Sequence, residues 1–360
     1  MISMQELISN MSASKGVVGL TNIGNTCYGN ATLQALRHQV DLTIFLLQGN
    51  HTKLLERRPT SEKSKLLEAY AKLCRQLWTG EGGTEKTHDF WGHMIPSAIL
   101  AGFDQFRIPV AHDAHEFLVF LLDQFHEAMK DEVTMIVKAD HGKRQTREAL
   151  DFWKKTFEKQ YSPLVELVFA LQRKAILCGG CQKESVSWET MNMFKVSVPK
   201  ITEGTTLQLV DLMCSDAKAE TIEAYHCDHC APTRHSAQIS HTLWRLGNWV
   251  ICVLKRVDNT GKRVNTPVEI PLKTNFTTLF HSASTEPSKN DTYELFATIQ
   301  HHGSANGGHY TSQAKHPVTG RWAFYDDERA TVFEEGRLPN LDASTYIVMF
   351  RRITNTVASP

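Results

Sequence analysis

The chain has 360 residues, of which 41% are hydrophobic and 22% are charged, a balance that is typical of folded globular proteins. Lys and Arg together number 39, as do Asp and Glu, so no overall charge attracts the chain to nucleic acid or to an anionic membrane. The longest apolar runs, such as 43–47 and 249–254, are too short to span a bilayer. The composition therefore excludes disordered, strongly basic and membrane-spanning classes of protein.

The first sixteen residues contain neither a basic segment nor an apolar run as long as that of a secretory signal, and Ile2 excludes myristoylation. We therefore expect an intracellular protein of the cytosol or nucleus. In that setting the eight cysteines are better explained as reduced thiols, metal ligands or catalysts than as a disulfide framework. We expect residues 1–16 to be a short leader and 353–360 a tail, with no further targeting domain.

The apolar residues of the first half, from about residue 27 to residue 172, follow helical spacing. The clearest helix is expected at 111–129, where seven apolar residues fall on one face. These residues are Ala114, Phe117, Leu118, Leu121, Leu122, Phe125 and Met129. Residues 130–160 are rich in charge and are expected to form a solvated helix and loop.

From about residue 176 onward the pattern changes to that of strands, as in the alternation of Phe194, Val196 and Val198. Breaks rich in Gly and Asn separate the later expected strands. These strands lie at 249–257, 293–303, 309–316, 321–328 and 346–352. Helices followed by strands predict an α+β fold with an antiparallel sheet.

Cys27 follows a turn that contains Gly24, and Thr26 is a candidate N-cap for a helix that begins at the cysteine. Unpaired N–H groups and the helix dipole at such a position favour a thiolate. Asn22 and Asn25 bring side-chain donors close to this thiol, and either could bind an oxyanion. Taken alone, Cys27 is better explained as a buried structural cysteine, because free cysteines are among the most buried residues.

The segment 301–312 contains a pair of glycines followed by His309, which is expected to open a strand. Asp326 lies 17 residues later, on what is expected to be the next strand of a hairpin. Adjacent antiparallel strands can bring such a carboxylate beside an imidazole. Taken separately, His309 is better explained as a turn histidine and the acidic run 326–328 as a solvated loop. Together with Cys27, however, these residues supply a nucleophile, a base and a group that orients the base.

Two Cys-x-x-Cys pairs are separated by the 45 residues 182–226, a spacing that can place four thiolates around a tetrahedral Zn²⁺. The four cysteines are Cys178, Cys181, Cys227 and Cys230. A thioredoxin-like redox motif is the alternative, but each pair would then need a βαβ unit, and none is apparent. We predict a structural zinc ribbon that stabilises a thin β extension. His226, His229 and His235 lie near the second pair, and one of them could replace a cysteine ligand.

Three parts of the chain resemble the ubiquitin-specific proteases, a family of papain-like cysteine deubiquitinases. The segment 19–34 (GLTNIGNTCYGNATLQ) resembles their cysteine box, and 111–122 (AHDAHEFLVFLL) resembles the acidic helix motif that follows it. The segment 301–312 (HHGSANGGHYTS), with 322–328 (WAFYDDE), resembles their histidine box. The motifs occur in the order of the family, and the resemblance extends from about residue 17 to residue 352.

The resemblance implies a role for each candidate residue. Cys27 is expected to be the nucleophile, His309 the general base and acid, and Asp326 the residue that orients His309. Asn22 is expected to donate to the oxyanion, and Asp327 to support the site from outside the reacting groups. The residues implied to contact the tail of ubiquitin are Gly307, Gly308 and Tyr310.

The resemblance also implies a papain-like α+β fold in one catalytic domain of residues 17–352. Its parts would be a helical thumb (about 17–160), zinc-ribbon β fingers (about 161–255) and an antiparallel β palm (about 256–352). The implied activity is hydrolysis of the peptide or isopeptide bond after the C-terminal glycine of ubiquitin, through a cysteine thioester. Ubiquitin and ubiquitinated proteins are the expected partners, and one structural Zn²⁺ is the expected cofactor. We expect a monomer that binds neither nucleic acid nor a membrane.

Four positions depart from the pattern of the family, which usually has Met-Asn-Ser where this chain has Gly29, Asn30 and Ala31, Gln at Ala111 and Phe at Val257. Gly29 is expected to weaken its helix by about 1 kcal/mol, and Ala111 and Val257 leave the detail of tail recognition open. Two alternative functions are a protease for another ubiquitin-like modifier and a ubiquitin-binding scaffold without turnover. A zinc-ribbon protein that binds nucleic acid is a third, which the zero net charge disfavours.

Overall fold

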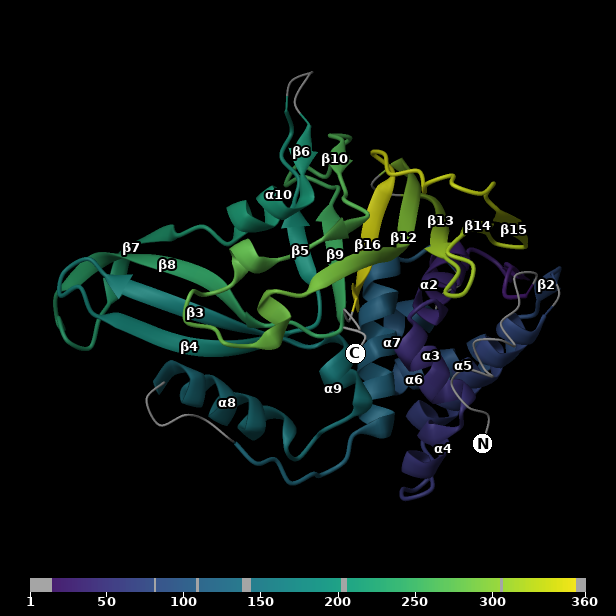
Figure 1. Cartoon of the computed structure of the whole chain (residues 1–360), viewed down its shortest axis with the longest axis horizontal. Helices are drawn as coiled ribbons and strands as arrows, with labels where there is room; N and C mark the ends of the chain where they lie inside the picture. The colour runs from purple at the N-terminus through teal and green to yellow at the C-terminus, as the bar shows by residue number, and fades with distance from the viewer. Residues whose placement is uncertain are drawn as a thin grey trace, which may run out of the picture.

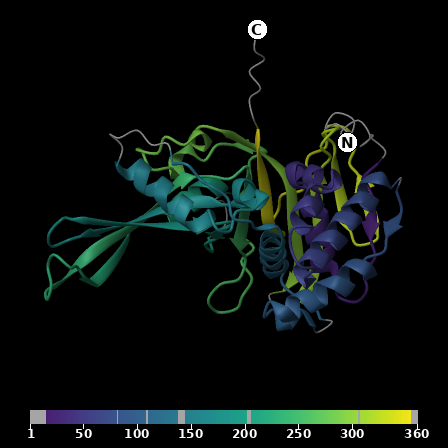
Figure 2. The same cartoon turned by 90° about the horizontal axis from the view of Figure 1, so that it is seen from below.

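The computed structural model describes residues 15–80, 82–107, 110–137, 144–201, 206–304 and 307–353. These residues form a helical lobe, a large sheet beside it, and a narrow extension of four strands that projects away from both (Figure 1 and Figure 2). Most of the expected leader and tail, residues 1–14 and 354–360, lies outside the described residues. Within the described ranges, no helix is both long enough and apolar enough to cross a lipid bilayer.

The helical lobe comes from the first half of the chain, as predicted. Its elements are α2 (Cys27–Arg37), α3 (Val40–Leu47), α4 (Asn50–Leu55), α5 (Glu62–Thr79), α6 (His88–Leu100), the 3-10 turn η1 (Asp104–Arg107) and α7 (Ala114–Met129). Helix α7 lies at the centre, and all seven of its predicted apolar residues are buried. The side chain of Asp113 caps this helix by accepting from the backbone N–H groups of His115 and Glu116 at 2.7 and 3.2 Å.

The large sheet has eight strands, in the order β15-β14-β13-β12-β16-β9-β5 with β11 paired to β12. Their bounds are β5 (Phe194–Ser197), β9 (Trp249–Lys255), β11 (Lys273–Thr274), β12 (Thr292–Ser304), β13 (Gly307–Lys315), β14 (Trp322–Asp326), β15 (Arg329–Val332) and β16 (Thr345–Ile353). The pairs are antiparallel, as predicted, except that β5 runs parallel to β9. One face packs against α2 and α7, and the other forms a second core with α10 (Leu209–Asp216).

The extension is an antiparallel sheet of four strands in the order β4-β3-β8-β7. These strands are β3 (Ala170–Cys178), β4 (Glu184–Met191), β7 (Glu220–His226) and β8 (Arg234–Arg245), and two helices, α8 (Arg144–Phe157) and α9 (Pro163–Val168), precede them. The sequence pattern did not indicate β7, because none of its residues is buried and so it lacks an apolar face.

Four short strands form two parallel pairs, and two 3-10 turns complete the described elements. The pairs are β1 (Gly19–Leu20) with β2 (Thr84–Glu85) and β6 (Leu207–Gln208) with β10 (Val268–Glu269), and the turns are η2 (Thr277–Leu279) and η3 (Pro287–Lys289). Pair β1–β2 places the segment that leads to Asn22 beside the helical lobe. The division into thumb, fingers and palm at the predicted residue numbers stays a prediction.

Packing explains why a glycine lies at position 29 of α2, a position that helix propensity alone disfavours. A Cβ added to Gly29 would lie 2.5 Å from Cζ2 of Trp91. This indole cannot easily move, because it stacks on Phe117 at a centroid distance of 5.5 Å and meets the edge of Tyr28 at 5.9 Å. The glycine therefore makes room for a buried tryptophan in the helix that carries Cys27.

Gly29→Ala should lower the free energy of unfolding by about 1–2 kcal/mol, because overpacking a core costs about 1–3 kcal/mol and outweighs a propensity gain of about 1 kcal/mol. Urea unfolding followed by circular dichroism measures the change. Gly92→Ala in α6 is the matched control, since a Cβ there meets no atom within 4 Å, and it should stabilise the protein. A gain of stability in both variants would contradict the packing account.

Candidate active site

Cys27 is the first residue of α2, and 5% of it is exposed. Thr26 occupies the predicted N-cap position, but its hydroxyl does not cap the helix. Instead Thr26 Oγ1 accepts from the backbone N–H of Ile23 and donates to Asn22 Oδ1, each at 3.2 Å. The threonine therefore stabilises the turn before the cysteine, and the first N–H groups of the helix are left for other partners.

The sulfur of Cys27 lies against the start of β13. Burial raises the pKa of the Cys27 thiol, the backbone N–H of Tyr310 opposes this effect by donating to the sulfur, and the negative charge of Asp327 raises the pKa further. Since Tyr310 directly follows His309, the backbone of His309 lies beside the sulfur. The structure thus brings residues 309 and 310 to Cys27, from which they are far apart in the sequence.

His309 and Asp326 lie on the neighbouring strands β13 and β14, whose antiparallel register continues from the pair Ser312 and Tyr325. His309 Nε2 and Asp326 Oδ1 are 2.5 Å apart. The expected hairpin and the expected contact between imidazole and carboxylate are both present. Because Nε2 faces the carboxylate, Nδ1 is the ring nitrogen that remains for another partner.

The carboxylate of Asp327 accepts hydrogen bonds from Asn22 and Asn30 rather than from His309. Its Oδ2 accepts from Asn22 Nδ2 at 2.8 Å, and its Oδ1 accepts from Asn30 Nδ2 at 2.7 Å. Asn22 Oδ1 in turn accepts from the backbone N–H of Thr26 at 3.2 Å. The role of Asn30 is not predicted from the sequence. A buried polar residue three positions after the nucleophile on a helix is the signal that could have identified it.

The predicted tail-binding residues line one cavity of about 200 Å³ between the helical lobe and the large sheet. Its lining includes Gly307, Gly308 and Tyr310, together with Ala111, His112, Asp113, Arg256, Val257, Arg263, His301 and Tyr346. The two glycines differ, because a Cβ on Gly307 would meet no atom within 4 Å, whereas one on Gly308 would lie 2.3 Å from the carbonyl oxygen of His302. Gly308 is therefore required by its own hairpin, and Gly307 faces open space.

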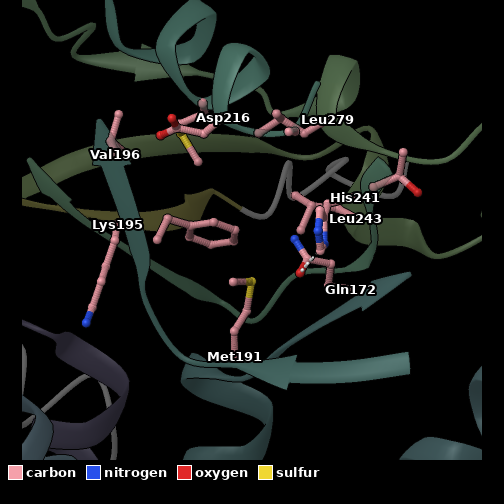
Figure 3. Close-up of a pocket in the computed structure, with 12 residues that line it drawn as sticks. Gln172, Met191, Lys195, Val196, Asp216, His241, Leu243 and Leu279 are labelled. Carbon is pink, nitrogen blue, oxygen red and sulfur yellow. Dashed lines mark hydrogen bonds between the residues drawn. The ribbon is translucent and has the colours of Figure 1, made fainter. Parts of the chain in front are cut away.

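Another cavity, of about 190 Å³, lies where the four-stranded extension meets β5 and α10 (Figure 3). It is bordered by Gln172, Val196, Asp216, His241 and Leu279, among others. None of the predicted catalytic or tail-binding residues lines it. Of these two cavities, the one that contains Tyr310 therefore adjoins the candidate catalytic residues.

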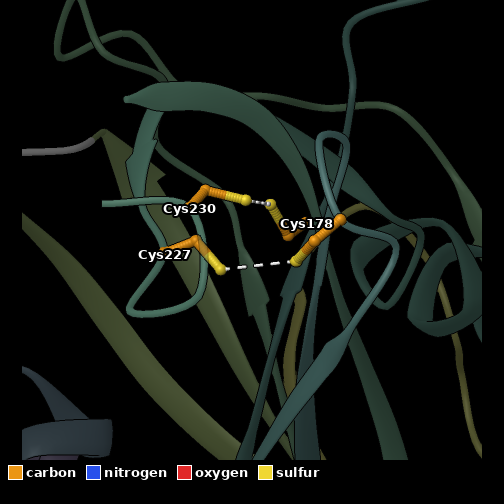
Figure 4. Close-up of side chains that lie close together, drawn as sticks. Cys178, Cys227 and Cys230 are labelled. Atoms are coloured by element: carbon orange, nitrogen blue, oxygen red, sulfur yellow. Dashed lines mark hydrogen bonds between the residues drawn. The ribbon is translucent and has the colours of Figure 1, made fainter. Parts of the chain in front are cut away.

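The four paired cysteines come together at the end of the extension, where their sulfur atoms point toward one another (Figure 4). The Sγ atoms of Cys178 and Cys230 are 3.8 Å apart, and those of Cys181 and Cys227 are 3.6 Å apart. A tetrahedral ion with metal–sulfur distances of about 2.3 Å requires sulfur separations of about 3.8 Å, whereas a disulfide is close to 2 Å. These residues could therefore hold one metal ion.

The electrostatics of the cluster also favour a cation. The backbone N–H of Cys181 is the largest influence that lowers the pKa of Cys178, to about 7. Burial, followed by the neighbouring Cys181 and Cys178, raises the pKa of Cys230 to about 12. A first thiolate forms readily, and further thiolates need a positive charge between them. Among the described residues, no histidine joins the group formed by these four sulfur atoms, and His235 instead covers Gly180.

The raised pKa of Cys27 makes a testable prediction about its reactivity. Thiolate is the species that iodoacetamide alkylates, so alkylation of Cys27 at pH 8 should be slower than that of an exposed thiol and should still be rising above pH 9. Asp327→Asn removes a charge that raises this pKa and should therefore accelerate alkylation at pH 8. Mass spectrometry of the peptide that contains Cys27 measures the rate, and an Asp327→Asn rate equal to that of the unchanged protein would refute the electrostatic contribution.

A family model described as Ubiquitin carboxyl-terminal hydrolase matches residues 18–350. Ubiquitin carboxyl-terminal hydrolase Usp2 of Drosophila melanogaster is 28% identical over 343 residues, which cover 94% of this chain and 35% of that protein. Human Ubiquitin carboxyl-terminal hydrolase 2 is 26% identical over 347 residues, covering 93% of this chain and 55% of that protein. The chain thus spans between 35% and 55% of the length of these two relatives.

Two solved structures share the fold. A chain of the yeast SAGA DUB module superimposes with a TM-score of 0.69 at 21% identity, over 95% of this chain and 70% of that chain. A chain of the SAGA DUB module bound to monoubiquitin gives a TM-score of 0.70 at 19% identity, over 94% of this chain and 70% of that chain. The predicted α+β fold is confirmed, and because the family model matches almost the whole described chain, the protein belongs to the ubiquitin carboxyl-terminal hydrolase family.

Proposed function

We propose that this chain is a thiol-dependent deubiquitinase that hydrolyses the peptide or isopeptide bond after the C-terminal glycine of ubiquitin. The observation that carries the proposal is the arrangement at Cys27, which begins α2 and receives the backbone N–H of Tyr310, while the preceding His309 is held by Asp326. A nucleophile, a base and a carboxylate that orients the base are the groups that acyl transfer requires.

In the proposed reaction, Cys27 attacks the carbonyl carbon of the last glycine of ubiquitin. Because burial raises the pKa of the Cys27 thiol, a base is needed to remove its proton, and Nδ1 of His309 is the ring nitrogen suited to this, since Nε2 contacts Asp326. The amide of Asn22 and nearby backbone N–H groups donate to the oxyanion. His309 then gives the proton to the departing lysine amine, and water activated by the same imidazole releases ubiquitin from the thioester.

The cavity beside the catalytic residues is the proposed site for the tail of ubiquitin. It is lined by Gly307, by the acidic side chain of Asp113 and by two basic residues, Arg256 and Arg263, so it presents charges of both signs to an extended peptide. The carboxylate of Asp113 is held by the hydroxyl of Tyr346 at 2.8 and 3.0 Å, which gives the acidic group a fixed place. The solved structure with monoubiquitin supports ubiquitin as the partner of this fold.

We also propose that the four cysteines of the extension hold one Zn²⁺. Four thiolates in tetrahedral arrangement are typical of structural zinc, with no coordination position open for a substrate. The ion would join the turn after β3 to the turn after β7 at the far end of the thin sheet, and no step of the reaction involves it. An intracellular location is consistent with cysteines that, among the described residues, form no disulfide.

The test uses ubiquitin that carries an electrophile in place of its C-terminal carboxylate. The protein should form one covalent adduct at Cys27, and Cys27→Ala should form none. An adduct that persists in Cys27→Ala would exclude this nucleophile. Binding of ubiquitin without any adduct in the unchanged protein would support the alternative of a scaffold without turnover.

A protease for another ubiquitin-like modifier is the second candidate function, because Ala111 and Val257 line the proposed tail cavity where the family usually has larger side chains. Each replacement removes volume from the cavity wall and could admit a bulkier tail. Rates measured side by side on ubiquitin and on ubiquitin-like modifiers with the same fluorogenic leaving group would separate the two functions. A higher kcat/KM for a modifier other than ubiquitin would favour the second.

A further inference from the structure

Asn30 lies one helical turn after Cys27 on α2, and 1% of it is exposed. Its Nδ2 donates to Asp327 Oδ1 at 2.7 Å and also lies 3.4 and 3.3 Å from the backbone carbonyl oxygens of Leu20 and Thr21. One side chain therefore joins three separate segments: the helix of the nucleophile, the strand β1 with the residue after it, and the turn between β14 and β15.

The acceptors around Asn30 fix the orientation of its amide. A reversed amide would place Oδ1 against a carboxylate and two carbonyl oxygens, which have no hydrogen to share. In the observed orientation, Oδ1 has no hydrogen-bond partner among the described residues, which is a costly state for a buried oxygen. The charge-assisted bond to Asp327 offsets this cost. Donation to Asp327 is therefore the contact that determines how the side chain is placed.

The carboxylate of Asp327 connects Asn30 to Asn22, because it accepts a hydrogen bond from each. Its backbone has a φ of +48°, a left-handed conformation that is uncommon outside glycine and that aspartate adopts more readily than most residues, typically in turns. Two amides hold the carboxylate, Asn30 at Oδ1 and Asn22 at Oδ2. At the other end of the Asn22 side chain, Oδ1 accepts from the backbone N–H groups of Gly24 and Thr26 at 3.0 and 3.2 Å. Both ends of the Asn22 amide are thus fixed.

We propose that Asn30 is a positioning residue that holds the carboxylate of Asp327 and through it orients the amide of Asn22 toward the oxyanion. The proposal rests on the function proposed above for Asn22. Among the described residues, the side-chain hydrogen bonds of Asn30 go to Leu20, Thr21 and Asp327 and to none of the reacting groups. Its loss should therefore affect kcat and leave KM nearly unchanged, because the tail cavity lies elsewhere and the oxyanion exists only in the transition state.

The first experiment measures hydrolysis of a fluorogenic ubiquitin amide by Asn30→Ala, Asn22→Ala and the double variant. Asn30→Ala should lower kcat by about 10- to 100-fold, the scale expected when a catalytic group is misplaced by about 1 Å. If Asn30 acts through Asn22, the double variant should lose no more than Asn22→Ala alone. Losses that multiply in the double variant would overturn the proposal.

Two further variants separate positioning from general stability. Gln34→Ala removes another buried amide of α2, which donates to the backbone carbonyl of Val18 at 2.8 Å and contacts none of the candidate catalytic residues, so it should lower the melting temperature and retain kcat. Asn30→Asp keeps the volume of the side chain but replaces its donor with an acceptor, and should lose at least as much kcat as Asn30→Ala. Retention of kcat by a folded Asn30→Asp variant would overturn the proposal.

A second measurement does not depend on ubiquitin. In Asn30→Ala the carboxylate of Asp327 keeps its negative charge but loses one of its two amide donors, so the less compensated charge should raise the pKa of the Cys27 thiol further and alkylation at pH 8 should become slower. The double variant with Asp327→Asn should react no slower than Asp327→Asn alone. If the unchanged protein fails to hydrolyse the ubiquitin amide, the proposed function fails, while this measurement still tests Asn30. The proposed effect of Asn30 on Asp327 would be refuted if Asp327→Asn accelerates the alkylation of Cys27 while Asn30→Ala leaves its rate unchanged.

Discussion

The kcat for hydrolysis of a fluorogenic ubiquitin amide should fall by about 10²- to 10⁴-fold in His309→Gln, the usual contribution of a positioned general base and acid. The effect should be large because burial raises the pKa of Cys27, so the neutral thiol cannot attack until a base accepts its proton. Glutamine can donate to Asp326 but cannot accept a proton. KM should change little, because the ring of His309 is not part of the tail cavity.

His302→Gln is the matched control for this variant. His302 is paired directly with His309 across β12 and β13, so both replacements change a histidine at the same level of the same hairpin. His302 Nε2 lies 3.2 Å from Thr311 Oγ1 and has no contact with Asp326. The control should keep a kcat close to that of the unchanged protein. Equal losses in the two variants would contradict the assignment of His309 as the base.

Cys227→Ser should abolish binding of one metal ion per chain and disorder the end of the four-stranded extension. Binding of structural zinc is worth about 10–16 kcal/mol in small zinc-binding peptides, and strand β7 buries none of its side chains, so little else can hold it in place. Metal content measured by mass spectrometry should fall from about one ion per chain to about none. Hydrogen exchange should become fast across β3, β4, β7 and β8, and α7 should remain protected because it lies in the core.

Cys214→Ser provides the control for loss of a cysteine. Cys214 is half-buried in α10, where its sulfur donates to Thr278 Oγ1 at 3.5 Å, and it lies outside the cluster of four sulfur atoms. This variant should retain the metal and the exchange pattern of the unchanged protein. A metal content that is unaffected by Cys227→Ser would refute the zinc proposal, and an equal loss in both variants would refute its location.

The elements that the sequence predicted correctly are those whose signals are local. Helix α7 has an apolar face that repeats with the helical period and an aspartate cap at its start, and both arise from residues within a few positions of one another. The strand pair that carries His309 and Asp326 also has a short connection, so their contact could be anticipated from alternation and turn residues. The paired cysteines were recognisable because the Cys-x-x-Cys spacing is itself a local pattern.

Two differences from the sequence predictions come from contacts between distant segments. Gly29 is disfavoured by helix propensity, yet the structure requires it because Trp91 of another helix packs against it. Strand β7 has no apolar face, and it forms a strand because it pairs with β8. Burial and pairing depend on which segments become neighbours, and local periodicity does not contain that information.

By itself, the sequence determined the α+β class, the helix that presents Cys27, the hairpin of His309 and Asp326, and the two cysteine pairs. Only the tertiary structure decided that the carboxylate of Asp327 accepts hydrogen bonds from the side-chain amides of Asn22 and Asn30. Asn22 and Asp327 are 305 residues apart, and Asn30 and Asp327 are 297 apart. Such contacts exist only where the helical lobe packs on the sheet, because a partly buried carboxylate is paired with whichever donors the completed fold places beside it.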